Sequence, residues 1–162
     1  MLFGKKKERI TIEQLAATLR TNYKEVVAHA KQQFYELEKY GIELPSNADL
    51  EITLMAYAAF DYAMSQGPEI ELRNKLRDLF LELDMPNQEL LKNIVERCDE
   101  YSDVLNHMKN GDLVRLKVGK VLAKHLGHED DPRIAGVAGI HFESIVNTMS
   151  GTTSECIRQI AK

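Results

Sequence analysis

The spacing of apolar side chains follows a helical period along almost the whole chain. Between Thr11 and Tyr40 they recur every three or four positions, which places them on one face of a helix. Thr11 and Gln14 have capping-box spacing, and Gly41 can adopt the left-handed conformation that ends a helix. At roughly 1.5 Å per residue, the predicted first helix would be about 45 Å long, which is more than a small domain needs.

The second predicted helix spans Ala48 to Gln66 and is apolar on nearly every side. A helix without a polar face normally lies buried, with neighbours on several sides. A second copy of the protein would be another way to cover part of that surface. Because the first helix is overlong and the second is so apolar, we expect a homodimer or another protein partner.

Glycine, proline and capping residues divide the rest of the chain into further helices. The expected boundaries, in chain order, are Gly67-Pro68, Met85-Pro86, Asn110-Gly111, Gly127 and Gly151. Asp112 is expected to cap the fifth helix. The sixth helix is expected to run from Pro132 to Met149, and Gly151 separates it from a short last helix. The fourth helix is predicted to bury a stripe of residues at steps of three and four: Leu91, Ile94, Cys98, Tyr101, Leu105 and Met108.

These elements predict an all-α protein, an antiparallel bundle of about six helices plus a short C-terminal helix. Loops of about two to eight residues favour antiparallel neighbours. Residues 11–162 are predicted to form a single helical domain, and residues 1–10 a basic, flexible N-terminal tail. No apolar stretch reaches the length of a membrane span, so we expect a soluble protein. Cys98 and Cys156 form no CxxC pair and indicate a reducing, cytoplasmic location.

The charge of the chain limits the partners that it can bind. A net charge of −4 argues against general binding of polyanions, and the absence of Trp argues against base stacking, so no nucleic-acid partner is expected. The predicted fifth helix is a local exception. Its positive side chains gather beside or opposite a valine stripe: Arg115, Lys117, Lys120 and Lys124. Because a basic amphipathic helix can bind nucleic acid or anionic lipid, such a surface is one alternative function.

Acidic side chains on the predicted fourth helix form a first candidate metal site. Glu96, Asp99 and Asp103 are spaced by three and four positions, so they lie close together on a helix surface. Clustered carboxylates of this kind can hold Mg²⁺. The fourth helix precedes the basic helix directly, so its acids could also simply balance the lysines of that helix. A metal-dependent all-α hydrolase is therefore a second alternative function.

Histidines near the fifth-to-sixth connection form a second candidate metal site. His125 and His128 stand three residues apart in an acidic segment that ends at Asp131. They could share Zn²⁺ if the helix continued between them, but Gly127 is expected to end it there. His141 falls near the apolar stripe of the sixth helix, and we expect a core histidine with a satisfied hydrogen bond.

Two glycines interrupt the predicted sixth helix. Gly136 and Gly139 each cost about 1 kcal/mol relative to alanine, which close approach of another helix backbone would offset. That backbone could come from the same chain or from a second subunit. The chain has no nucleophile motif, phosphate-binding loop or dinucleotide fingerprint, and no cofactor is expected. The sequence therefore favours a non-enzymatic helical protein that acts through protein contacts as a homodimer.

Overall fold

The computed structural model describes residues 10–84, 88–110 and 112–157. Over these ranges the chain forms a short 3₁₀ helix, η1 (Leu37–Tyr40), and the α-helices α1 (Ile12–Glu36), α2 (Ala48–Gln66), α3 (Ile70–Asp84), α4 (Gln88–Asn106), α5 (Val114–His125) and α6 (Pro132–Ile157). The all-α class is therefore confirmed. The tail was predicted at residues 1–10, of which residues 1–9 lie outside the described part of the chain, as does the break at Met85-Pro86. Ile10 packs against the core and is not part of a flexible tail.

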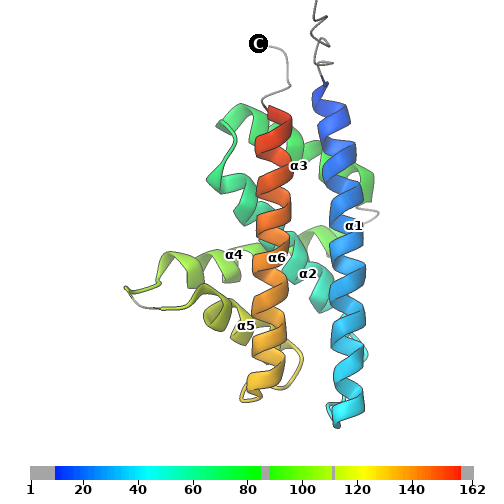
Figure 1. The fold of residues 1–162 in the computed structure, drawn as a ribbon, viewed down its shortest axis with the longest axis vertical. Helices are drawn as coiled ribbons and strands as arrows, with labels where there is room; N and C mark the ends of the chain where they lie inside the picture. Colours follow the sequence, from blue (N-terminus) through cyan, green and yellow to red (C-terminus); the bar gives the residue numbers. More distant parts are fainter. Residues whose placement is uncertain (1–9, 85–87, 111, 158–162) are drawn as a thin grey trace, which may run out of the picture.

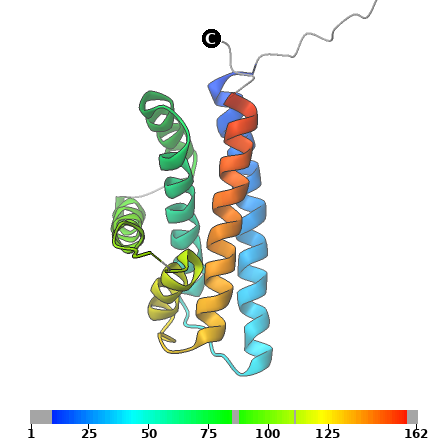
Figure 2. The ribbon, with the colours of Figure 1, turned by 60° about the vertical axis from the view of Figure 1, so that its left-hand side comes forward.

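The two longest helices, α1 and α6, form an antiparallel pair along the length of the molecule (Figure 1). In a second view, α2 lies against this pair, and α4 crosses on the other side of α2 (Figure 2). The α5 helix packs against the first half of α6, and α3 packs on α1 and α2. None of the described helices is both long enough and apolar enough to cross a lipid bilayer.

The first predicted helix begins after Thr11 and ends at Tyr40 as expected, but its last four residues form the 3₁₀ helix η1 instead of continuing α1. At the start, the Thr11 amide donates to the Gln14 side chain at 2.8 Å and the Gln14 amide donates to the Thr11 hydroxyl at 3.2 Å. At the end, the chain tightens into η1 before Gly41, whose φ of 77° is left-handed. Ile42 then folds back and is buried. Because α6 has 26 residues against 25 in α1, the long first helix is matched within the chain.

The apolar second helix is covered by its own chain. Ile52, Leu54 and Phe60 point in three different directions from the helix axis, and all three are buried. The helices that pack around α2 are α1, α3, α4, α5 and α6. The prediction of a buried central helix is confirmed. Its apolar surface consequently needs no second copy of the protein.

A group of aromatic rings joins α3 to this core. Phe80 of α3 is buried and stacks on Phe60 with ring centroids 4.2 Å apart. Tyr23 and Tyr57 meet the same ring edge-on, at 5.1 and 5.7 Å. Edge-to-face and offset rings of this kind stabilise a core beyond their buried area. Phe80 thereby ties α3 to both α1 and α2.

The last helix is continuous, and the predicted stop at Gly151 is wrong. Within the described residues, α6 runs without a break to Ile157, so the predicted short C-terminal helix is not a separate element. Thr152, just past the predicted stop, accepts a hydrogen bond from the Asn22 side chain of α1 at 2.9 Å. Thr153 is buried and donates to the Met149 carbonyl at 2.7 Å. Packing of these turns against the core outweighs the weak helix propensity of one glycine.

The fourth helix buries most of its predicted stripe, including Cys98 and Leu105, which pack against the core, but the first position differs. Ile94 and Tyr101 are buried as expected, but Leu91 is exposed and its neighbour Leu90 packs against the core instead. Val95, one turn beyond Leu91, is 52% exposed. The outer face of α4 therefore carries aliphatic side chains among its acids.

The fifth helix begins without the predicted cap. The Asp112 carboxylate accepts a hydrogen bond from the Lys109 amide at 2.9 Å, on the N-terminal side of the helix. The N-cap position belongs to Leu113, whose side chain makes no capping hydrogen bond. Gly127, with φ of 74°, ends the helix as predicted. The start of α5 thus exposes an aliphatic residue instead of a polar one.

Cys98 on α4 is expected to resist alkylation in the folded protein. Burial, and then the nearby Asp61 carboxylate, raise its pKa from 9.0 to about 12, so little thiolate forms at pH 8. We expect iodoacetamide to label Cys98 at least tenfold more slowly than the less buried Cys156, as followed by mass spectrometry of the separate peptides. In concentrated urea both should react alike. Equal rates in the native protein would mean that α4 does not bury this thiol.

Candidate functional site

The α5 and α6 helices pack with their backbones in direct contact. A Cβ atom at Gly119 of α5 would overlap the Ala135 carbonyl, and one at Gly139 of α6 would overlap the Arg115 carbonyl. One glycine from each helix therefore allows the close approach. This confirms the expected packing at Gly139, with the neighbouring backbone supplied by the same chain. Gly136 differs, because nothing lies within 4 Å of the position that its Cβ would occupy.

An open groove of about 340 Å³ lies along this helix pair. We call it the α5–α6 groove, and its lining residues are Asp112, Leu113, Leu116, Lys117, Lys120, Pro132 and Ala135. Leu113 and Leu116 are 52% and 49% exposed. Ile140 is also exposed and follows Gly136 by one turn of α6. Leu113 and Leu116 are thus aliphatic side chains that the core leaves open, and they lie together in one groove.

Positive charge borders the α5–α6 groove. Among the described residues, Lys117 pairs with Asp112 at 3.6 Å and Lys120 makes no ion pair. The α5 sequence contains no acidic residue. Two of the predicted interaction residues, Lys117 and Lys120, therefore line one surface, and Gly136 lies on the neighbouring helix. Lys124, the third predicted lysine, pairs with Glu100 outside the groove.

The two groove leucines were missed in the sequence, although a signal was present. Leu116 stands between Arg115 and Lys117, away from the buried residues Val118 and Leu122. An aliphatic residue on the basic face of an amphipathic helix either packs on another element or faces solvent. Periodicity does not distinguish these outcomes, because the neighbours of that face come from elsewhere in the chain.

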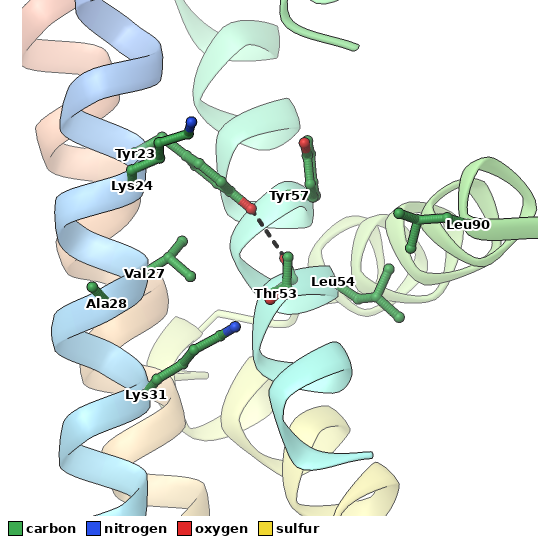
Figure 3. A pocket seen from close by; sticks show the side chains of 9 residues that line it. All are labelled: Tyr23, Lys24, Val27, Ala28, Lys31, Thr53, Leu54, Tyr57 and Leu90. Atoms are coloured by element: carbon green, nitrogen blue, oxygen red, sulfur yellow. Dashed lines mark hydrogen bonds between the residues drawn. The ribbon is translucent and has the colours of Figure 1, made fainter. Parts of the chain in front are cut away.

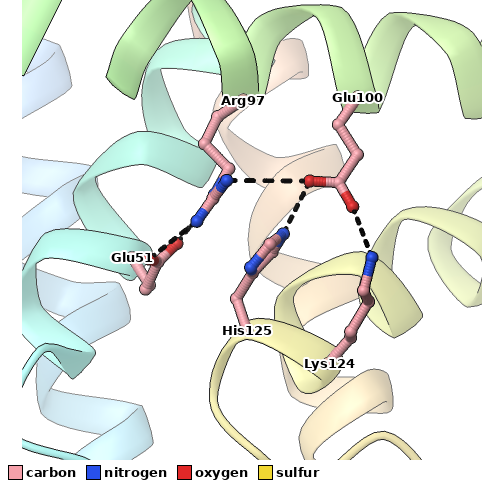
Figure 4. A network of polar contacts seen from close by, with 5 residues as sticks. All are labelled: Glu51, Arg97, Glu100, Lys124 and His125. Atoms are coloured by element: carbon pink, nitrogen blue, oxygen red, sulfur yellow. Dashed lines mark hydrogen bonds and ion pairs between the residues drawn. The ribbon is translucent and has the colours of Figure 1, made fainter. Parts of the chain in front are cut away.

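A polar network holds α5 against α2 and α4 (Figure 4). Arg97 donates two hydrogen bonds of 2.9 Å to the buried Glu51, which raises the Arg97 pKa, and lies 3.8 Å from Glu100. Glu100 also accepts from His125 at 2.6 Å and from Lys124 at 3.1 Å. Burial alone would raise the pKa of Glu100, but these two donors outweigh it and lower the pKa. The expected charge balance between α4 and α5 therefore exists at this point.

The beginning of α6 is fixed by Asp131. Its carboxylate accepts from the Arg133 amide at 2.8 Å and pairs with the Arg133 guanidinium at 2.6 Å. The Arg133 hydrogen bonds lower the Asp131 pKa to about 2. Asp131 thus caps α6, next to Pro132, which lines the α5–α6 groove.

The acidic metal candidates lie on the outer surface of α4. Glu96 pairs with Lys92 at 3.6 Å, and Asp103 faces His107 at 3.1 Å. Asp99 is exposed between them. No side chain from another helix joins these three acids, among the residues that the structure describes, in a group that could hold a metal.

The two histidine candidates lie apart, as the glycine between them predicted. His125 contacts Glu100, whereas the His128 Nε2 atom lies 2.6 Å from the Glu43 carbonyl oxygen. Gly127 ends α5 between the two rings. Over the described part of the chain, no three His, Cys, Asp or Glu side chains are grouped around a possible metal position. The hydrolase hypothesis therefore gains no site from the fold.

His141 lies in the core, as predicted, but the expected hydrogen bond is absent, because its ring makes none with any described residue. It is buried beside the rings of His29 and Phe34, with centroids at 5.6 and 6.1 Å. Burial, followed by the charge of His29, lowers the His141 pKa. The imidazole therefore serves packing between α1 and α6, and it does not line the α5–α6 groove.

A second depression of about 360 Å³ lies between α1 and α2 (Figure 3). Its walls include Val27 and Leu54, and two lysines stand at its rim. Lys31 is paired with Asp49 at 3.8 Å, and the Tyr23 hydroxyl donates to the Thr53 carbonyl at 3.2 Å. These polar groups have partners, whereas Lys120 of the α5–α6 groove makes no ion pair with any described residue, so that groove is the stronger candidate.

Comparisons with models of known protein families, with curated protein sequences and with solved structures found no match. The groove is therefore interpreted from its own shape and charge.

Proposed function

We propose that this protein acts through protein contacts and that the α5–α6 groove binds an amphipathic helix with acidic side chains. The observation that carries the proposal is the pair of half-exposed leucines, Leu113 and Leu116, in a groove bordered by Lys117 and Lys120. Amphipathic helices bind such grooves by placing apolar side chains at helical spacing against the floor. Acidic side chains beside that apolar row would meet the lysines and fix the register.

The rigidity of the groove supports this proposal. Its walls are joined through the glycine contacts at Gly119 and Gly139, so the two helices have little freedom to separate. The network from Glu100 to His125 holds the far end of α5. A surface that is already ordered loses less conformational entropy when a partner binds.

The proposal includes a non-enzymatic role and a cytoplasmic location. The free thiols of Cys98 and Cys156 support a reducing compartment. Binding of nucleic acid or anionic lipid would use the same lysines but would not need the leucines between them. The two kinds of partner therefore differ in their dependence on Leu116.

A designed peptide tests the groove directly. We expect a fluorescein-labelled helix with leucines at three-four spacing and flanking glutamates to bind the full chain, as measured by anisotropy. Leu116→Glu should weaken this binding at least tenfold, because a buried leucine contributes about 1.5–3 kcal/mol and the new carboxylate repels the glutamates. A twin peptide with lysines in place of the glutamates should not bind.

Ile70→Glu is the matched control, since Ile70 is an exposed aliphatic residue on α3, away from the groove. It should leave the peptide affinity unchanged, and circular dichroism should show both variants folded. Equal binding of the two peptides, or no effect of Leu116→Glu, would contradict the proposal. So would binding of an oligonucleotide or of phosphatidylserine vesicles that Lys120→Glu weakens and Leu116→Glu does not.

A further inference from the structure

The outer face of α4 has the chemistry that the α5–α6 groove would bind. Leu91, Val95, Asp99 and Asp103 recur every four residues, so they form one row on the helix surface, here called the α4 stripe. All four side chains are exposed. Glu96 lies beside the row and adds a further carboxylate. The stripe therefore presents two aliphatic side chains followed by two carboxylates on a helix that is already formed.

The charges of α4 divide between its two sides. Glu100, on the inner side, is occupied by Lys124 and His125 of the same chain. On the outer side, Asp99 makes no ion pair with any described residue, and the same is true of Lys120 in the groove. The contacts inside one chain thus leave an unpaired acid on the α4 stripe and an unpaired base at the α5–α6 groove.

The two helices that carry these surfaces are neighbours in the fold. Both views show α4 and α5 on the same side of the α1–α6 pair (Figures 1 and 2). A two-fold axis that brings the α4 stripe of one copy to the groove of the other also makes the reverse contact, and so closes the assembly at two subunits.

We propose that the acidic helix bound by the α5–α6 groove is the α4 stripe of a second copy of this chain. This inference rests on the proposed function and names its partner. Leu91 and Val95 of one copy contact Leu113 and Leu116 of the other, and the acids of the stripe meet Lys120. The contact is therefore made twice in each dimer.

Charge reversal on each surface tests this arrangement. Sedimentation velocity of the full chain should give twice the 18.5 kDa subunit mass as micromolar concentration rises. Lys120→Glu and Asp99→Lys, each alone, should weaken self-association about tenfold, because each replaces attraction by repulsion at both contacts. A mixture of the two variant proteins should dimerise like wild type. In the mixed dimer, one contact joins the two inverted charges and the other joins native Lys120 and Asp99.

Charge reversals elsewhere provide matched controls. Glu25→Lys on α1 and Lys39→Glu on η1 reverse the charge of exposed side chains in the same two senses, and they should leave self-association unchanged. A chain that stays monomeric while the acidic peptide still binds and Leu116→Glu still weakens it overturns this inference and leaves the proposed function intact. A dimer that the mixture fails to restore overturns it too, because the copies would then meet on other surfaces. Loss of peptide binding alone counts against the proposed function.

Discussion

Replacing Gly139 by alanine is expected to lower the free energy of unfolding by roughly 3 kcal/mol, the upper end for overpacked cores. The added methyl group would overlap the Arg115 carbonyl, which is backbone and cannot move aside alone. To accept it, α5 and α6 must separate, and the packing around Gly119 would loosen with them. Urea unfolding followed by circular dichroism measures the change.

Gly136 offers the matched control within the same helix. Its Cβ position is open, so Gly136→Ala adds the same methyl group without a clash. The gain in helix propensity should raise the free energy of unfolding by about 0.5–1 kcal/mol. Opposite signs at two glycines three residues apart would be difficult to obtain from propensity alone. If both substitutions stabilise the protein, the backbones of α5 and α6 are not in contact.

Replacing Arg97 by methionine is expected to cost about 3 kcal/mol, because it leaves the Glu51 carboxylate buried without its partner. Methionine keeps much of the arginine stem, so the loss is mainly electrostatic. Glu51→Gln should cost less. The Glu51 side chain is 7% exposed against 20% for Arg97, and Arg97 would still have Glu100 within 3.8 Å.

A double-mutant cycle separates the charge from the packing in this prediction. We expect the variant with both Glu51→Leu and Arg97→Met to be more stable than Arg97→Met alone, since no buried charge is left. Urea unfolding of the three variants and the wild type gives the coupling energy. If the two changes simply add, Glu51 and Arg97 do not form the pair described above.

Both predictions concern the support of the α5–α6 groove. The glycine contacts set the distance between its walls, and the Glu51–Arg97–Glu100 network fixes one end of α5 against the core. Variants at either place should therefore weaken the binding of the designed peptide and also lower the stability of the fold. Gly136→Ala gives a useful contrast, because it stabilises the helix and leaves the wall contact intact.

Local chemistry explains why many helix ends were predictable. The capping pair Thr11 and Gln14 and the left-handed Gly41 act over three or four residues, so the sequence contains the whole interaction. Asp131 caps α6 and Gly127 ends α5 for the same reason. The separation of the candidate metal ligands His125 and His128 followed from that one glycine.

Other features depend on contacts between distant residues. Leu90 and Leu91 are adjacent, and helical periodicity fits a buried face with either of them. The choice follows from Arg97 meeting Glu51 on α2 and from Tyr101 stacking on Phe142 of α6 at 5.6 Å. Likewise, the stop signal at Gly151 is local, but the contacts that carry α6 past it come from α1 and α2.

The apolar surface that a second copy would cover is also decided by contacts between distant residues. The sequence alone determined an all-helical chain, most of its helix ends, and the residues that carry the charge of α4 and α5. It did not determine that α1 is matched by α6, that α2 is covered within the chain, or that Leu113, Leu116 and Val95 are left open. Exposure is what remains after all contacts have formed, so it depends on the tertiary structure as a whole. Only the packed chain therefore shows where apolar surface is still available to a partner.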